Sequence, residues 1–406
     1  MPPTEQTSNG ALVATGKGWI VTLAGTGINL ALGVLYSWSV ISKKIPDEWG
    51  WNEADKALPY TIACLVFAFM MVPAGKLQDL FGPRLVATLG GLFTGLGLIL
   101  AYQFNSVAMY VLCFGVLAGT GFGLGYSSTT PPAIKWFPPA KTGMIAGIVV
   151  AGFGLASVYI APLAQYLIGL YGVPDTMLIF GVSFLVIVVI LAQFLKNPPT
   201  VALTPQSGTT PATKTDDYKI GQVLSTYQFY VLWLMYAFNA GAGLMVIGKL
   251  AKVVSFQASY EAGFILVALL AVGNAGGRIL AGMLSDSLGR IRTLQLFTLF
   301  QAVLMFLTPF VDSALVLVFF AICIGMNYGS NLSVFPSITK DFFGLKNFGV
   351  NYGLVFTAWG VGSLLALVSG IVYVRTNSFQ LAFFLAGALL IVSIILSFTI
   401  KKPKSN

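Results

Sequence analysis

Arg278 is the residue whose type and position could do chemistry in this sequence. It lies in an apolar stretch, eight residues before Asp286 at the end of that stretch, or about 12 Å along a helix axis. If the stretch spans a membrane, an arginine at that depth costs roughly 2.5–3.5 kcal/mol and usually faces a cavity on a substrate path. The alternative is a structural arginine paired with a buried group. No aspartate or glutamate falls within the apolar core of an expected helix, so we interpret Arg278 as an anion site.

The residues expected around Arg278 fit a small carboxylate. A guanidinium matches a carboxylate with two parallel hydrogen bonds. Asn274, one helical turn earlier on the same face, could donate to that carboxylate or bond a neighbouring helix instead. Tyr36, Tyr126 and Tyr328 lie in helices expected to line a central cavity, and each offers an apolar ring with a polar tip. Alone each tyrosine fits packing better; together with Arg278 they form a candidate pocket.

The composition indicates that these residues sit in a membrane protein. Of 406 residues, 57% are hydrophobic and only 9% are charged, whereas a soluble domain carries about a quarter charged residues. The exterior must therefore face lipid, and the 45 glycines suit closely packed membrane helices. The net charge of +9 follows the expected loops and forms no stripe, so we expect the lipid bilayer as a partner and no nucleic acid.

Twelve apolar segments have the length of about 20 residues that a spanning helix needs. We predict an all-α membrane protein with two pseudo-symmetric six-helix bundles, 1–195 and 226–406, joined by a polar linker at 196–225. The predicted spans are about 18–42, 57–75, 85–104, 107–133, 142–170, 174–195, 226–253, 260–281, 292–311, 313–337, 348–373 and 379–400.

The distribution of lysines and arginines orients the chain. If both termini are cytoplasmic, 15 of the 22 basic residues lie on that side, 6 lie on the other, and Arg278 lies within a helix. Cytoplasmic loops of membrane proteins carry this excess. We therefore expect a multi-pass protein of the cell inner membrane with cytoplasmic termini, and a functional monomer.

The two halves repeat each other. The pattern Gly-x-Leu-x-Asp-x-x-Gly occurs at 75–82 and again at 282–289, and glycines at 119, 123, 143, 147 and 154 recur 206 residues later. Repeats of this kind build many secondary transporters, with the substrate site at their interface. The acid and base of each copy could latch a cytoplasmic gate, or could serve topology alone. These residues are Asp79 and Arg84 in the first half and Asp286 and Arg290 in the second.

These repeated segments resemble the loop signature of the major facilitator superfamily, which implies twelve helices in two bundles. GVLYSWSV at 33–40, KWFP at 135–138, NAGGR ending at Arg278, FPS at 335–337 and NYG at 351–353 are similar to the monocarboxylate transporter family and its oxalate:formate exchanger relatives. The resemblance implies that Arg278 binds the substrate carboxylate and that Tyr36, Tyr126 and Tyr328 are pocket aromatics.

Two departures from the family pattern bear on the substrate and the proton. Trp359 stands where the oxalate exchanger has a second cation, a lysine, so one carboxylate is expected rather than two. Asn274 stands where mammalian lactate carriers have an aspartate, and the first predicted helix holds no lysine from Gly18 to Ser42. The groups that couple protons in those carriers are therefore replaced here.

We accordingly predict a secondary transporter that moves small monocarboxylates such as lactate or pyruvate together with a proton. Carboxylate exchange, which needs no proton-bearing residue, remains the alternative. An enzyme is not expected, because no nucleophile, paired acids or metal site appears in the apolar segments. With no histidine and three cysteines outside metal spacing, we expect no cofactor and no metal.

Overall fold

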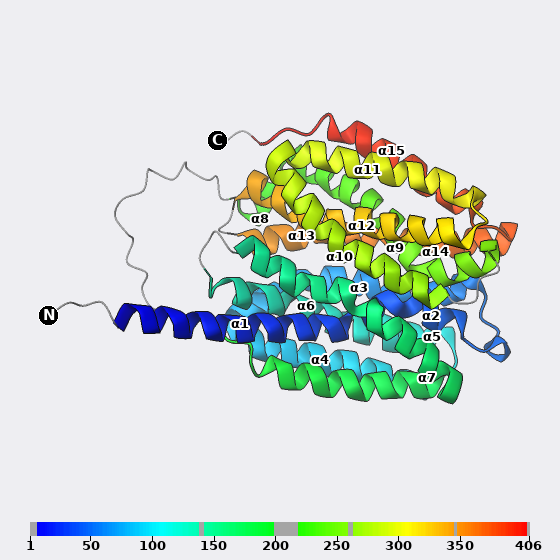
Figure 1. The fold of residues 1–406 in the computed structure, drawn as a ribbon, viewed down its shortest axis with the longest axis horizontal. Helices are drawn as coiled ribbons and strands as arrows, with labels where there is room; N and C mark the ends of the chain where they lie inside the picture. Colours follow the sequence, from blue (N-terminus) through cyan, green and yellow to red (C-terminus); the bar gives the residue numbers. More distant parts are fainter. Residues whose placement is uncertain (1–5, 138–141, 199–217, 259–262, 345–346, 404–406) are drawn as a thin grey trace.

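The computed structural model describes residues 6–137, 142–198, 218–258, 263–344 and 347–403, and every regular element in those ranges is a helix. The helices run side by side along the long axis of the molecule (Figure 1). We call the end of the bundle where α1 begins and α15 ends the terminal face, and the other end the opposite face. An apolar chain of this kind satisfies its backbone polar groups within helices, which is what a bilayer requires.

The longer helices supply the predicted spans. Eleven helical stretches in the described chain are long and apolar enough to cross a membrane. The helices are α1 Gln6–Leu32, α3 Glu53–Phe81, α4 Pro83–Ala101, α6 Gly119–Ile134, α7 Thr142–Ala192, α9 Tyr227–Ala258, α10 Gly263–Leu288, α11 Arg290–Leu307, α12 Ala314–Phe343, α13 Phe348–Gly362, α14 Leu364–Thr376 and α15 Gln380–Ser397.

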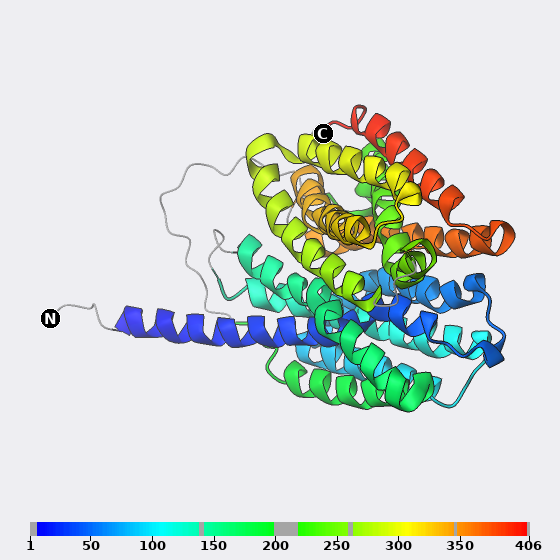
Figure 2. The ribbon, with the colours of Figure 1, turned by 45° about the vertical axis from the view of Figure 1, so that its right-hand side comes forward.

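Helix α7 contains two of the predicted spans. Its 51 residues would extend about 77 Å as one helix, more than twice the thickness of a hydrocarbon core. Gly172 interrupts it with a φ of 81° and a ψ of 176°, followed closely by Pro174. The chain doubles back at this point (Figure 1 and Figure 2). The eleven stretches therefore correspond to the twelve predicted spans.

Two other spans are built from consecutive segments of different helix types. The first combines α1 with a 3-10 segment, η1 (Gly33–Ser37), and α2 (Trp38–Lys43). The fourth combines α5 (Val107–Tyr110), a π-helical segment at Val111–Ala118, and α6. Such segments rotate the side chains that follow relative to a regular helix. The 3-10 segment contains Tyr36, one of the predicted pocket residues.

The repeated glycines at the terminal face make the tightest connections in the bundle. Gly82 has a φ of 81° between α3 and α4, and Gly289 has a φ of 90° between α10 and α11. Glycine populates this left-handed region without steric cost. The sequence predicts longer connections, because the predicted spans end at 75 and 281 and resume at 85 and 292. Helix α3 instead continues to Phe81, so a single residue joins each pair.

Equivalent glycines also set the helix packing within the two halves. A Cβ added at Gly119 or Gly123 of α6 would meet the backbone of α3 at Ala63 and Phe67. A Cβ at Gly325 or Gly329 of α12 would meet the backbone of α10. Small residues allow this close approach between membrane helices. The repeat seen in the sequence is therefore a repeat of helix contacts.

The predicted linker at 196–225 is described only in part, since 199–217 lies outside the described residues. Within it, α8 spans Ile220–Leu224, and the Nδ2 atoms of Asn347 and Asn351 both donate to the carbonyl of Tyr218 at 3.0 Å. The end of this segment is thus a helix attached to the bundle. The division into domains at 1–195 and 226–406 stays a prediction.

Neighbouring glycines on α10 provide a matched test of the packing. A Cβ at Gly277 would overlap the backbone of α12 at Met326, whereas a Cβ at Gly276 would meet nothing within 4 Å. We expect Gly277→Val to destabilise the protein by about 1–3 kcal/mol or more, since overpacking forces the backbones apart. Gly276→Val should leave the melting temperature in detergent nearly unchanged. Equal melting temperatures for the two variants would contradict this packing.

Candidate functional site

Arg278 is buried on α10 and its guanidinium points at the other half of the chain. Only 6% of the residue is exposed. Its Nε donates to Oδ1 of Asn274 at 3.1 Å, one turn earlier on the same helix. Its Nη1 donates to the backbone carbonyl of Val150 on α7 at 2.6 Å. The sequence places Asn274 on the same helix face as Arg278, and the structure shows it accepting from Arg278, while its donation to a substrate carboxylate stays a prediction. The contact with Val150 was not predicted.

The guanidinium lies against a glycine of α7. A Cβ added at Gly154 would sit 3.1 Å from Nη2 and 3.2 Å from Cζ of Arg278. Contacts that short require the neighbour to move, so glycine leaves room for the planar group to lie close to the α7 backbone. Gly154 is one of the repeated glycines, and its counterpart Gly360 of α13 meets α3 at Ala68 in the same way.

Two hydrogen-bond donors at this position have no protein acceptor among the described residues. Neither an ion pair nor a hydrogen bond of the described chain involves Nη2 of Arg278. The Nδ2 of Asn274 is fully buried and also lacks an acceptor there. A fully buried donor such as Nδ2 of Asn274 normally has a partner, because an unmade bond costs about 1–3 kcal/mol. The arrangement can therefore accept an oxygen anion.

Three of the predicted pocket residues form a hydrogen-bonded chain between the halves. The hydroxyls of Tyr36 and Tyr328 lie 2.6 Å apart, and Nε1 of Trp359 donates to the Tyr328 hydroxyl at 2.7 Å. All three side chains are buried. They come from η1, α12 and α13, so this chain joins the first half to the second. Tyr36, Tyr328 and Trp359 therefore both pack in the core and hydrogen-bond to one another.

Tyr126 is held by aromatic rings rather than by this chain. Its ring centroid lies 5.3 Å from Phe67, 5.4 Å from Phe153 and 6.2 Å from Phe356. Phe67 and Phe356 also contact the indole of Trp359, at 5.2 and 5.1 Å. Edge-to-face and offset arrangements at these distances are favourable. The four predicted aromatics therefore share one continuous aromatic cluster.

The three phenylalanines of this cluster were not predicted. Residue type gave no signal, because the chain has 31 phenylalanines in apolar helices. Position offered one: Phe153 immediately precedes Gly154, and Phe356 lies one turn before Gly360. Both repeated glycines mark the helix faces where the two halves approach. Residues on those faces were the candidates for the pocket wall.

The predicted gate residues meet at the terminal face in the second half. Nη1 of Arg290 lies 2.6 Å from Oδ1 of Asp286 and also donates to the Ser285 hydroxyl at 2.5 Å. Nε of Arg290 lies 3.2 Å from Oδ2 of Asp341 at the end of α12, an acid the sequence did not single out. In the first half Arg84 is exposed at the start of α4, and the side chain of Asp79 lies outside the described residues.

The described part of the chain contains no set of side chains that could bind a metal ion. No group of three or more histidine, cysteine, aspartate or glutamate side chains could hold an ion there. Cys64, Cys113 and Cys323 are buried as free thiols. The polar groups at the centre are amide, guanidinium, phenol and indole, which bind by hydrogen bonds and charge.

The chain is similar in sequence to several membrane transporters. The chain is 30% identical over 350 residues to the uncharacterized MFS-type transporter YhjX of Escherichia coli, covering 85% of this chain and 86% of the relative. It is 28% identical to the oxalate:formate antiporter of Oxalobacter formigenes, covering 82% and 79%. It is 27% identical to monocarboxylate transporter 13 of Bos taurus, covering 93% and 87%.

Solved structures share the fold. A bacterial homologue of the human lysosomal transporter Spinster, in an inward-facing and occupied conformation, superposes with a TM-score of 0.69 at 15% identity, over 93% of this chain and 96% of that one. The family model of the Major Facilitator Superfamily matches residues 19–366 and 232–406. Together these two ranges cover nearly the whole sequence. The chain therefore belongs to the major facilitator superfamily of membrane transporters.

Proposed function

We propose that this transporter carries small monocarboxylates of the lactate and pyruvate type together with a proton across the cell inner membrane. The observation that supports it most is Arg278, a buried guanidinium that meets no acidic side chain in the described chain. A buried cation is strongly destabilising unless an anion compensates its charge. A bound carboxylate supplies that charge and fits the planar donor group.

The neighbouring groups suit the rest of such a substrate. Nη2 of Arg278 and Nδ2 of Asn274 lie ready to donate to the carboxylate oxygens, and a 2-hydroxyl or 2-keto oxygen can bond a phenol. The cluster of Tyr36, Tyr126 and Tyr328 with its phenylalanines presents an apolar wall to a short carbon chain. The printed names of the relatives, an oxalate:formate antiporter and monocarboxylate transporters, favour the same ligand class.

Trp359 supports the proposal that the substrate carries a single carboxylate. Its indole is fully buried and bonded to Tyr328, so the position contributes a neutral donor rather than a second cation. One guanidinium and one carboxylate make a neutral pair, whereas a dicarboxylate would bring an uncompensated charge into a medium of low dielectric. We therefore propose a monocarboxylate rather than a dicarboxylate substrate.

The site lies where the two halves of the chain meet, as alternating access requires. Arg278 on α10 contacts α7, and Tyr36 on η1 contacts Tyr328 on α12. Rocking of one half against the other would open these contacts to one face at a time. The ion pairs of Arg290 with Asp286 and Asp341 tie α10, α11 and α12 at the terminal face, which we assign to the cytoplasm from its excess of basic residues. We assign the functional unit as a monomer.

Exchange of carboxylates is the second candidate. One relative is named as an oxalate:formate antiporter, and an antiporter exchanges one substrate for another. In exchange the site carries an anion in both directions, so no proton-bearing group is needed. In symport the carrier must return without its anion, and a proton must travel with each substrate.

Substitution of Arg278 tests the anion site. We expect Arg278→Lys to lower lactate counterflow into preloaded liposomes by at least about a hundredfold, because a lysine cannot form the two parallel bonds and loses the contact to Val150. Arg375→Lys, at an exposed arginine near the end of α14, should leave transport unchanged. Normal counterflow by Arg278→Lys would remove the basis of the proposal.

An imposed pH gradient separates symport from exchange. In liposomes without internal substrate, we expect labelled lactate to accumulate when the external pH is lower, and to leak out when an uncoupler collapses the gradient. Symport moves a proton with each anion, so the gradient drives net uptake. Uptake that needs internal carboxylate and ignores the pH gradient would assign the protein to exchange.

Competition between anions tests the role of Trp359. A tenfold excess of pyruvate should inhibit lactate uptake strongly, since both are short monocarboxylates. Oxalate at the same concentration should inhibit weakly, because its second carboxylate finds no cation. Strong inhibition by oxalate with none by pyruvate would contradict the single-cation site.

A further inference from the structure

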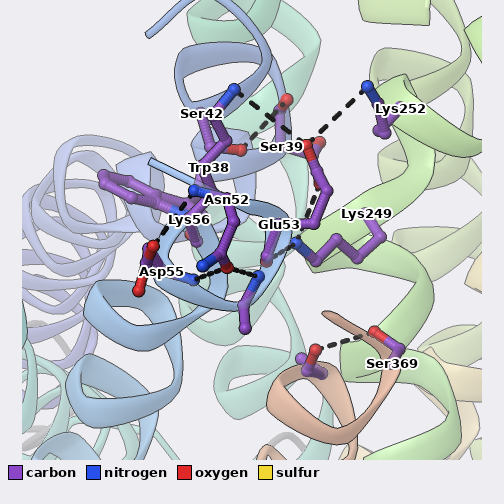
Figure 3. Close-up of polar contacts among 12 residues, drawn as sticks. Trp38, Ser39, Ser42, Asn52, Glu53, Asp55, Lys56, Lys249, Lys252 and Ser369 are labelled. Carbon is purple, nitrogen blue, oxygen red and sulfur yellow. Dashed lines mark hydrogen bonds and ion pairs between the residues drawn. The ribbon is translucent and has the colours of Figure 1, made fainter. Parts of the chain in front are cut away.

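The opposite face carries a second carboxylate environment built around Glu53, the first residue of α3. The helix start is fixed by Asn52, whose Oδ1 accepts from the backbone N–H of Ala54 at 2.8 Å and of Asp55 at 3.0 Å. This cap directs the Glu53 side chain toward α9 (Figure 3). The Glu53 side chain is only 11% exposed.

Three ammonium groups surround this one carboxylate. Nζ of Lys249, a side chain only 4% exposed, lies 3.2 Å from Oε2 of Glu53 and donates to the Glu53 backbone carbonyl at 2.7 Å. Lys252 lies 3.7 Å from Oε1, and Lys56 lies 4.0 Å from it. Lys252 also lies over the ring of Tyr373. Among the described residues, the three lysines share this one carboxylate as an ion-pair partner, so positive charge is in excess around Glu53.

The contact joins the two halves of the chain. Lys249 and Lys252 belong to α9, whereas Glu53 and Lys56 belong to α3. Beside them the Tyr60 hydroxyl donates to the carbonyl of Leu244 at 3.2 Å, again from α3 to α9. When the opposite face opens, α3 must part from α9. Lys56 then stays with Glu53, and the two lysines of α9 lose their carboxylate.

We propose that Lys249 and Lys252 form an entrance site for the transported anion, which Glu53 occupies while the opposite face is closed. This rests on the proposed function, since it takes the same class of ligand, a small monocarboxylate. On opening, the substrate carboxylate replaces that of Glu53 beside the ammonium of Lys249. When the face closes again, Glu53 returns to Lys249 and displaces the substrate, which moves inward to Arg278.

The physical reason is that two ammonium groups three residues apart on α9 share the Glu53 carboxylate while this face is closed. A single exposed lysine that loses an ion partner is hydrated and changes little in energy. Two neighbouring like charges repel each other once that carboxylate has left, and charge-assisted bonds to a substrate carboxylate offset the repulsion. Lys44, exposed on the same face, lacks both the burial and the contact to Glu53 and serves as the matched control.

If the contact between Glu53 and Lys249 only holds the opposite face closed and binds no substrate, the expected effect of Lys249→Met is the opposite of that expected for an entrance site. If the Glu53 contact only held this face closed, Lys249→Met would favour the open state and improve apparent affinity from the opposite face. Loss of an entrance site weakens affinity from that face only. The direction of the change therefore distinguishes the two roles.

The experiment measures lactate transport from each side in vesicles of defined orientation. For Lys249→Met we expect the half-saturating concentration at the opposite face to rise about tenfold, with that at the terminal face within twofold of wild type. Lys44→Met should leave both values unchanged. Equal changes at both faces, no change, or a lower value at the opposite face would overturn the proposal.

A charge swap controls for folding. Glu53→Lys combined with Lys249→Glu restores an ion pair between α3 and α9, so its melting temperature should return toward wild type. The carboxylate now belongs to α9, so the weak affinity at the opposite face should persist. Recovery of wild-type affinity would show that the pair is only structural. Failure of the proposed function has a different signature, since Arg278→Lys would then transport normally from both faces.

Discussion

The guanidinium of Arg278 in the middle of an apolar bundle is the constraint that the rest of the centre obeys. Such a charge has no water to solvate it, so the protein must bring polar atoms to it. Asn274 supplies one from the same helix, and the Val150 carbonyl supplies another from the other half. A helix carbonyl can serve only if the helix comes close, and Gly154 permits that approach. The cation therefore fixes where α7 and α10 cross.

A second pair of helices from the two halves, α13 and α3, also approaches closely at a glycine, but among the described residues no charged side chain lies at that contact. Gly360 of α13 packs against α3 at Ala68, as Gly154 of α7 packs against α10. The scaffold is thus pseudo-symmetric: Gly82 and Gly289 turn equivalent corners, and the glycines of α6 and α12 set equivalent contacts. Chemistry is placed on this scaffold unequally. The buried guanidinium lies in the second half, whereas Tyr36, Tyr126 and two of the phenylalanines lie in the first.

The sequence allowed prediction of those features that depend on local pattern. Hydrophobic length predicted the twelve spans, the fixed offset predicted the repeat, and the spacing of one helical turn placed Asn274 on the same face as Arg278. Features that depend on how distant helices cross could not be predicted. Val150 acts through its backbone, so its side chain carries no sign of the role. Asp341 and Glu53 lie outside the predicted spans 313–337 and 57–75, and their partners Arg290 and Lys249 are 51 and 196 residues away in the sequence.

Proximity across the halves also explains why proton coupling and exchange compete in a site of this design. In the proposed function, a carboxylate at Arg278 makes the site neutral and favours the rocking step for the loaded carrier. A carrier without its anion must move a buried cation instead, which favours exchange. The contacts from Asn274 and Val150 reduce that cost, because they solvate the guanidinium without any ligand. How completely two neutral acceptors replace a carboxylate therefore determines whether the protein returns alone, as symport requires, or only with another anion.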